Sequence, residues 1–376
     1  MSDRRILHLV HSLGRGGAET QLAYLSGGLI GLGWEVHVGY LGWGIGEETN
    51  IRRLNDAGSR LYRLRHYSNY DPTDILRLLN LIRRVNPSIV QTWLPYLDIV
   101  GGIATRLAGV PWVLTERNTP EFLGRGPKML LRGWIGRRAN AFVSNSPSGD
   151  EYWADRIGAD AQHRVIRNAL PLDELAAVVR ANRSAQGVPS DQKLVLFAGR
   201  LEPQKNIHIL LEALRIVLQR ENAVAMICGR GPLDSFVDSF VRKWGLAGRI
   251  IFPGFLPDLW SWIRAADVFV SVSRFEGMPN AVMEAVALEC PTVLSDIPTH
   301  RAILDEDSAL FAPPDDPNAI ADAIGSAIRD PERAMGRVKA GKKAAQEWSV
   351  GNAARAYAAV YEDVIAALDV RRLSAG

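Results

Sequence analysis

The sequence has only two cysteines, Cys228 and Cys290, in 376 residues. Two thiols are too few for a disulfide framework, so we expect both to be reduced and buried, as in a cytoplasmic protein. No run approaches the ~18 apolar residues of a membrane-spanning helix, and none is therefore expected. The apolar run at 6–10 is too short for a signal peptide. The expected location is cytoplasmic, with contact at the inner face of the membrane left open.

An excess of one charge is also missing. The chain has 44 basic and 41 acidic side chains, for a net charge of +3, which is too little for a typical nucleic-acid-binding protein. We therefore expect no nucleic-acid partner. Residues 1–180 carry 22 basic and 17 acidic side chains, whereas residues 181–376 carry 22 and 24. The first half thus suits an anionic partner or surface better than the second half.

Short apolar runs alternate with longer segments of helical period. The runs predict strands at 6–10, 36–41, 89–92, 112–115, 141–144, 194–198, 225–228, 250–252, 268–272 and 292–294. Helices are predicted at 18–32, 75–85 and 100–107, and from a cap at Asn206 onward. Such alternation predicts α/β domains with parallel sheets covered on both faces.

The pattern restarts near residue 190, after a stretch that contains Pro171 and Pro189. We therefore expect an N-terminal Rossmann-like domain over 1–180 and a C-terminal one over 181–349. A last helical segment, 350–376, is not followed by a strand and is able to pack on either half.

Three segments contain residues that are suited to ligand binding or catalysis. The first, Gly14–Glu19 (GRGGAE), lies between a predicted strand and a predicted helix, where glycines and a helix N-terminus favour phosphate. The second, Gly199–Asn206 (GRLEPQKN), ends a predicted central strand, and its Arg200 and Lys205 suit a diphosphate. An ordinary tight turn is the alternative for the first segment, and two solvated surface cations near a helix start are the alternative for the second.

The third segment, EGMPNAVMEA, has two glutamates, Glu276 and Glu284, separated by seven residues. Pro279 suits the first turn of a helix, so we expect Glu276 in the preceding loop and Glu284 within the helix. Each carboxylate is able to accept hydrogen bonds from sugar hydroxyls at the two ends of a nucleotide sugar. Taken alone, the segment is better explained as a helix with an acidic residue near its first turn and one exposed glutamate.

Together, these three motifs resemble glycosyltransferase family 4, and the resemblance covers most of the chain. It implies the GT-B fold, in which two Rossmann-like domains face each other across a cleft, and transfer of a sugar from a nucleotide sugar with retention. It also implies donor binding by the C-terminal domain, acceptor binding by the N-terminal domain, and a final helix that crosses back to the N-terminal domain. The donor is then a UDP- or GDP-linked sugar, and the acceptor is a saccharide or a lipid-linked saccharide.

The same resemblance implies roles for individual residues. Glu276 lies near the transferred sugar, and Arg200 and Lys205 stabilise the departing nucleotide. The donor-binding residues are Gly16, Gly17, Arg200, Lys205, Gly277, Met278, Pro279, Asn280 and Glu284. No cofactor and no metal are required; accordingly, Asp305–Asp307, which matches a D-x-D pattern, is predicted to be a solvated loop.

One segment departs from the family. Many members have a histidine after the strand predicted at 112–115, where this chain has Glu116, Arg117 and Asn118. Arg117 at the histidine's place suits a phosphate or an anionic acceptor, and Glu116 and Asn118 suit an acceptor. His11, at the end of the first strand, is a further acceptor-binding candidate. A structural ion pair is the alternative for Glu116 and Arg117.

The sequence therefore predicts a retaining glycosyltransferase of polysaccharide or glycolipid biosynthesis. A nucleotide-sugar epimerase and a non-catalytic nucleotide-sugar-binding regulator remain alternatives, and the oligomeric state is unknown. Segments 77–84 and 128–138 mix basic and apolar residues, which leaves open a peripheral membrane contact through the N-terminal domain.

Overall fold

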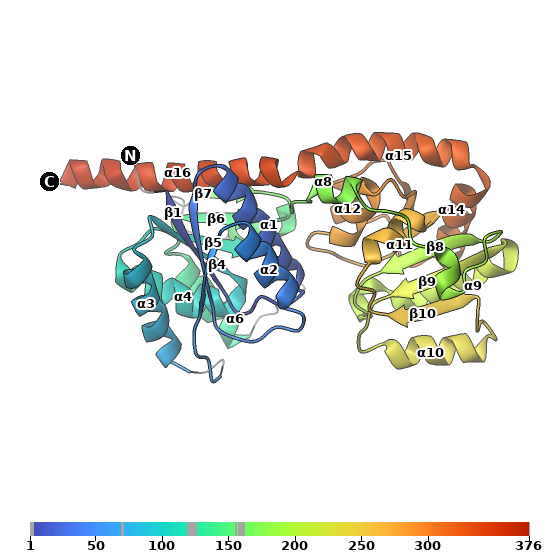
Figure 1. The fold of residues 1–376 in the computed structure, drawn as a ribbon, viewed down its shortest axis with the longest axis horizontal. Helices are drawn as coiled ribbons and strands as arrows, with labels where there is room; N and C mark the ends of the chain where they lie inside the picture. The colour runs from blue at the N-terminus through green and yellow to red at the C-terminus, as the bar shows by residue number, and fades with distance from the viewer. Residues whose placement is uncertain (1–3, 69–70, 119–125, 155, 157–161, 376) are drawn as a thin grey trace. The chain divides into compact units, whose positions relative to one another are not determined.

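The computed structural model describes residues 4–68, 71–118, 126–154, 156 and 162–375. The chain divides into two compact units. The N-terminal unit comprises Met1–Ala169 and Trp348–Gly376, and the C-terminal unit comprises Leu170–Glu347. Each unit is an α/β body built on a parallel sheet (Figure 1).

The N-terminal unit has a seven-stranded sheet in the order β3-β2-β1-β4-β5-β6-β7. Its strands are β1 (Arg5–Val10), β2 (Glu35–Tyr40), β3 (Arg60–Arg63), β4 (Ile89–Trp93), β5 (Trp112–Glu116), β6 (Ala141–Ser144) and β7 (Gln162–Val165). Its helices include α1 (Gly17–Gly31), α2 (Glu48–Asp56), α3 (Thr73–Val85), α4 (Leu94–Ala108), α6 (Pro127–Gly136), α7 (Pro147–Ala154) and α16 (Val350–Ala375).

Side chains of the sheet alternate between two apolar layers, as the period of a strand requires. In β1, Ile6 and Val10 pack in the layer that contains α1 and α16. Leu7 and Leu9 pack in the opposite layer, with α3 and α4. Both faces of the sheet are thus covered by helices, which explains why the central strands are apolar at successive positions.

Helix α16 belongs to the N-terminal unit although it follows the whole C-terminal unit in the chain. It packs beside α1, and Tyr361 stacks edge-on against Trp34. The Tyr361 hydroxyl donates to the side chain of Gln91 in β4, and Arg4 forms an ion pair of 2.8 Å with Glu362. The last helix therefore completes one apolar layer of the N-terminal sheet.

The C-terminal unit has a six-stranded parallel sheet in the order β10-β9-β8-β11-β12-β13. Its strands are β8 (Lys193–Ala198), β9 (Ala223–Cys228), β10 (Ile250–Gly254), β11 (Val268–Ser271), β12 (Thr292–Ser295) and β13 (Leu310–Ala312). Its helices include α8 (Leu172–Ala176), α9 (Ile207–Arg220), α10 (Asp234–Lys243), α11 (Leu259–Ala265), α12 (Asn280–Ala287), α13 (Pro298–Arg301), α14 (Pro317–Arg329) and α15 (Pro331–Ala345). One main core lies between the sheet and α9, α10 and α14.

The prediction of two Rossmann-like α/β bodies is confirmed, but three strands were missed. These are β3, β7 and β13, which all lie at sheet edges. An edge strand is covered less than a central one, so its sequence needs no continuous apolar run. In β3, for example, Arg60 and Arg63 are exposed. The cysteines are free and buried, as expected.

Two further expectations need correction. The expected domain boundary at 180 lies eleven residues after the observed division at 169, because α8 packs against α12 and Leu175 accepts from Arg264 of the C-terminal unit. Asn206 precedes α9 as expected but makes no side-chain cap. Its amide donates instead to the Pro314 carbonyl, and its oxygen accepts from Arg274.

Candidate active site

The sheet order reverses direction between β1 and β4 in the N-terminal unit and between β8 and β11 in the C-terminal unit. Loops at the carboxyl ends of such strands form the ligand crevice of open α/β sheets. The Gly14–Glu19 segment follows β1, Gly199–Asn206 follows β8, and Glu276 follows β11. All three predicted motifs therefore lie at switch points of the two sheets.

In the C-terminal unit, Lys205 and Glu276 form an ion pair. The Lys205 amine lies 2.5 Å from a Glu276 carboxylate oxygen, and the Ser273 hydroxyl donates to the same oxygen at 2.6 Å. Glu276 is only 7% exposed, and Thr299 donates to its carbonyl. The Glu276 carboxylate is thus buried although it lies in a loop, and the partly buried Lys205 amine compensates its charge.

Arg200 lies at the same strand end but in a different environment. Its guanidinium forms an ion pair of 2.8 Å with Glu202, and 62% of its side chain is exposed. It does not pair with Glu276. A solvated guanidinium is available to a diphosphate, whereas the Lys205 amine must be shared with Glu276.

The segment from Gly277 to Asn280 leads into α12. Asn280 is the first residue of the helix, Pro279 precedes it, and the amides of Val282 and Met283 point back to the Pro279 carbonyl. Met278 is partly exposed. This loop therefore brings a helix N-terminus next to Glu276, and such a terminus favours an anion.

Glu284 lies within α12, as predicted. It is not an exposed glutamate: burial raises the pKa of its carboxyl to about 7, and a hydrogen bond with Trp260 only partly opposes the shift. A carboxyl that is costly to ionise is common at ligand-binding positions.

Two glycines that sequence reasoning passed over shape the Arg200 loop. Gly229 has a φ of +134°, and a Cβ there would lie 1.9 Å from the Gly199 carbonyl oxygen. At Gly231, a Cβ would lie 2.5 Å from the Leu201 carbonyl oxygen. Both glycines could have been singled out from the sequence, because they form a Gly-x-Gly pattern directly after the strand predicted at 225–228.

His300 was also missed, because no ligand spacing singles it out. It is fully buried, and its Nδ1 lies 2.8 Å from the Ser295 carbonyl oxygen. Burial lowers the pKa of His300, although the Glu276 carboxylate opposes this effect. A neutral imidazole therefore lies in the electrostatic neighbourhood of the Lys205–Glu276 pair.

In the N-terminal unit, Gly16 and Gly17 are exposed at the start of α1. A Cβ at Gly16 would lie 2.1 Å from a carboxylate oxygen of Glu19. Burial raises the pKa of Glu19, and a hydrogen bond from its own backbone amide lowers it. The Glu19 carboxylate thus covers the N-terminus of α1, which is a candidate phosphate-binding site in the sequence analysis.

Glu116 does not suit the acceptor role that the sequence allowed. It is 1% exposed, and its carboxylate accepts from Arg132, from the Trp153 indole and from two backbone amides. Asp98 binds the other side of Arg132 at 2.8 Å. Glu116 therefore forms a buried ion pair with Arg132 rather than with Arg117. Asn118 contributes one of those amides.

Arg117 is held by α16. Its guanidinium donates to Asn168 and to the Tyr357 hydroxyl, each at 2.6 Å, and it lies over the Trp93 ring. These contacts secure it within the N-terminal unit, in a partly exposed position. A role for Arg117 in binding phosphate or acceptor stays a prediction.

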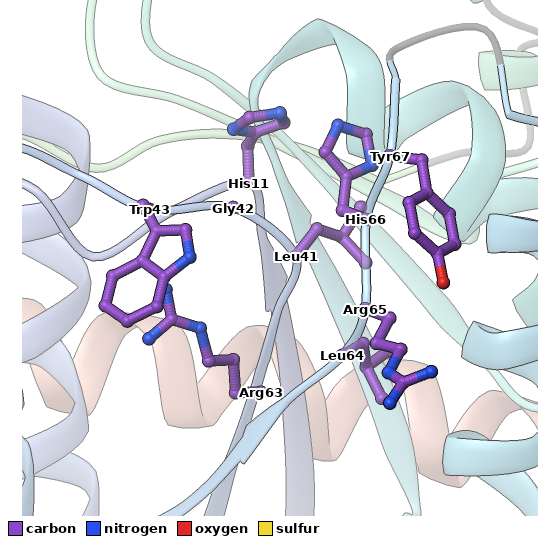
Figure 2. Close-up of a pocket in the computed structure, with 9 residues that line it drawn as sticks. All are labelled: His11, Leu41, Gly42, Trp43, Arg63, Leu64, Arg65, His66 and Tyr67. Carbon is purple, nitrogen blue, oxygen red and sulfur yellow. The ribbon is translucent and has the colours of Figure 1, made fainter.

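His11 lines a hollow of about 590 Å³ in the N-terminal unit (Figure 2). The other lining residues follow β2 or come from the end of β3 and beyond: Leu41, Gly42, Trp43, Arg63, Leu64, Arg65, His66 and Tyr67. Apart from His11, none of them was a candidate from the sequence. The signal was weak, because the residues come from three separate strand ends.

No group of three or more histidine, cysteine or acidic side chains among the described residues is arranged to hold a metal ion. In the predicted D-x-D loop, Glu306 pairs with Arg301, and Asp305 accepts from Ser308. None of the described helices is both long and apolar enough to cross a membrane.

Comparison with known proteins agrees with this geometry. The family model for glycosyl transferases group 1 matches residues 178–344, and that for glycosyltransferase family 4 matches residues 15–174. The lipopolysaccharide core biosynthesis mannosyltransferase LpsB of Rhizobium meliloti is 30% identical over 62% of this chain and 69% of its own length. The chain belongs to the group 1 glycosyltransferases of family 4.

A second relative and one solved structure are also similar to this chain. An Escherichia coli protein named UDP-Gal:alpha-D-GlcNAc-diphosphoundecaprenol alpha-1,3-galactosyltransferase is 26% identical over 60% of this chain and 62% of its own length. The structure of HepE from Anabaena in complex with UDP superposes with a TM-score of 0.81 at 18% identity, covering 96% of this chain and all of HepE. The resemblance to the GT-B fold is thereby confirmed.

Proposed function

We propose that this group 1 glycosyltransferase transfers a sugar from a UDP-linked donor to a saccharide or lipid-linked saccharide acceptor, with retention of the anomeric configuration. The Lys205–Glu276 pair beside the N-terminus of α12 carries the proposal. It joins a cation, a carboxylate and a helix N-terminus at the switch point of the unit that matches the group 1 model. The UDP-bound and UDP-glucose-bound HepE structures support UDP as the nucleotide.

The proposed reaction breaks the bond between the anomeric carbon and the donor phosphate. Negative charge then grows on the departing UDP, where Lys205, Arg200 and the positive N-terminal end of the α12 dipole stabilise it. The sugar becomes oxocarbenium-like, and Glu276 stabilises that positive charge. The acceptor hydroxyl forms the new bond on the face that UDP leaves, and its proton passes to the departing phosphate oxygen.

The donor is tested by thermal unfolding of the full chain with UDP, GDP, ADP and their sugars, with and without magnesium. A ligand at 100 times its Kd stabilises the protein by about 2.7 kcal/mol. We expect a stabilising shift with UDP ligands that does not require magnesium. A shift with GDP ligands alone would contradict the UDP assignment.

The site is tested with Glu276→Gln and Lys205→Met, and Lys193→Met is the control. Lys193 is a half-exposed lysine at the start of β8, and its amine pairs with Asp267. Loss of one charge-stabilising group costs about 3–4 kcal/mol in comparable sites, so both site variants should lose at least a hundredfold in turnover. Turnover by Glu276→Gln at the rate of Lys193→Met would refute its role.

Retention is tested by proton NMR of the first product formed from an α-linked donor. An α-linked product supports the proposed mechanism, and a β-linked product contradicts it. The epimerase alternative predicts conversion of the donor without an acceptor. The regulator alternative predicts UDP binding without any turnover.

We also propose that α6 contacts an anionic membrane surface. Leu130, Leu131 and Trp134 are 71%, 46% and 57% exposed, and Lys128 and Arg138 are exposed beside them. Apolar side chains next to basic ones suit the interface of an anionic bilayer. In the other basic segment, by contrast, Arg77 is paired with Asp71 and Asp74.

Sedimentation with phosphatidylglycerol vesicles tests the α6 surface. We expect Leu130→Ser/Trp134→Ser to reduce binding severalfold, whereas Leu107→Ser, at an exposed leucine of α4, should leave it unchanged. Equal binding by all three proteins would contradict the proposal.

A further inference from the structure

The hollow at the ends of β1, β2 and β3 is built from aromatic and basic side chains. Figure 2 shows Trp43 with Arg63 on one side and Arg65 with Tyr67 on the other, with the imidazoles of His11 and His66 between them. No acidic residue is among the nine described residues that line it. Trp43 and Tyr67 are 80% and 71% exposed. Exposed aromatic rings gathered around a hollow mark a binding site rather than a folding core.

The backbone beneath the hollow is tightly fixed. The amide of Gly42 donates to the His11 carbonyl at 2.6 Å. A Cβ at Gly44 would lie 2.3 Å from the backbone nitrogen of Gly14. The loop after β2 therefore packs directly on the loop after β1, so the hollow lies beside the Gly14–Glu19 segment.

Two buried groups orient the basic side chains. The Asp74 carboxylate, which is fully buried, lies 2.7 Å from His66 Nδ1 and accepts from the Tyr96 hydroxyl at 2.9 Å. This contact directs the other ring nitrogen of His66 away from Asp74. Similarly, Arg63 stacks on the Trp43 ring and lies 3.5 Å from the buried Glu47.

Arg65 is different, because no acidic side chain among the described residues pairs with it, and it is exposed. A guanidinium presents a planar fork of donors that matches phosphate oxygens. Together with an adjacent aromatic face, such a fork recognises an anion attached to a sugar ring.

We propose that this hollow binds the phosphate-bearing part of the acceptor: a sugar phosphate, with Arg65 and His66 on the phosphate and Tyr67 and Trp43 against the sugar. The identification of this ligand as the acceptor rests on the proposed glycosyl transfer. The binding of a sugar phosphate in the hollow does not depend on it. The same chemistry occurs in a free sugar phosphate and in a lipid-linked sugar diphosphate.

The test is calorimetric titration of the full chain with glucose 1-phosphate, inorganic pyrophosphate and geranyl diphosphate, each at saturating UDP so that the donor site is occupied. Arg65→Ala should weaken all three ligands about tenfold or more, because each loses a charge-assisted hydrogen bond. Tyr67→Ala should weaken glucose 1-phosphate but not pyrophosphate. Arg52→Ala, an exposed arginine on α2, should match the wild type.

The outcomes separate this inference from the proposed function. Absence of saturable binding for every probe, or equal affinity in Arg65→Ala and Arg52→Ala, would overturn the inference even if UDP binds and is turned over. Binding that depends on Arg65 in a chain that neither binds UDP nor turns over a donor would instead overturn only the proposed function. Geranyl diphosphate binding more tightly than pyrophosphate would identify the lipid-linked source, and equal binding the free sugar phosphate.

Discussion

Glu284 should destabilise the folded chain at neutral pH. Burial raises the pKa of its carboxyl from 4.5 to about 7. Between these two values the unfolded chain has an ionised Glu284 and the folded chain a protonated one, so rising pH favours the unfolded chain. Since a tenfold change in proton affinity equals about 1.4 kcal/mol, the full effect at pH 8 is about 3 kcal/mol.

The variant Glu284→Gln keeps the shape of the side chain and an oxygen for Trp260 but cannot ionise. We therefore expect its advantage in free energy of unfolding over the wild type to grow by about 3 kcal/mol between pH 4 and pH 8. Urea unfolding followed by tryptophan fluorescence measures this difference at each pH. Glu332→Gln, at an exposed glutamate in the first turn of α15, is the matched control.

A difference between Glu284→Gln and the wild type that stays constant from pH 4 to pH 8 would refute the reasoning. The same variant should bind UDP more weakly, because an amide accepts fewer hydrogen bonds from ribose hydroxyls than a carboxylate does. A more stable protein with a weaker ligand affinity is the expected signature of a residue kept for binding.

Three other predictions concern the described structure. Arg132→Met should destabilise the chain by about 3–5 kcal/mol, because it leaves Asp98 and Glu116 buried without their cation. Thermal or urea unfolding measures this loss. The control, Arg138→Met, should change the stability by less than about 0.5 kcal/mol. Gly229→Ala should cost more than about 2 kcal/mol and weaken UDP binding, since its Cβ meets the Gly199 carbonyl; a variant with unchanged Tm and Kd would contradict this. Removal of divalent metal with EDTA should leave sugar transfer unchanged, and restoration of lost activity by added magnesium would show that a metal is needed.

The order of elements along the chain could be predicted from local patterns. Central strands such as β1 and β8 are recognisable because all their residues after the first are buried on both faces, and nearly all of these are apolar. The three motifs follow such strands, so their positions at the carboxyl ends of the sheets were predictable as well. The edge strands β3, β7 and β13 were not, because partial exposure leaves no such pattern.

The sequence by itself determined which chemical groups follow which strands, since this depends on neighbours in the chain. Only the tertiary structure decided which of them meet. Lys205 and Glu276 are 71 residues apart and pair because β11 lies beside β8. Arg132 buries Glu116, which looked available in the sequence, and three strand ends assemble the hollow around His11 and His66. Such contacts depend on the order of strands in a sheet, which local composition does not encode.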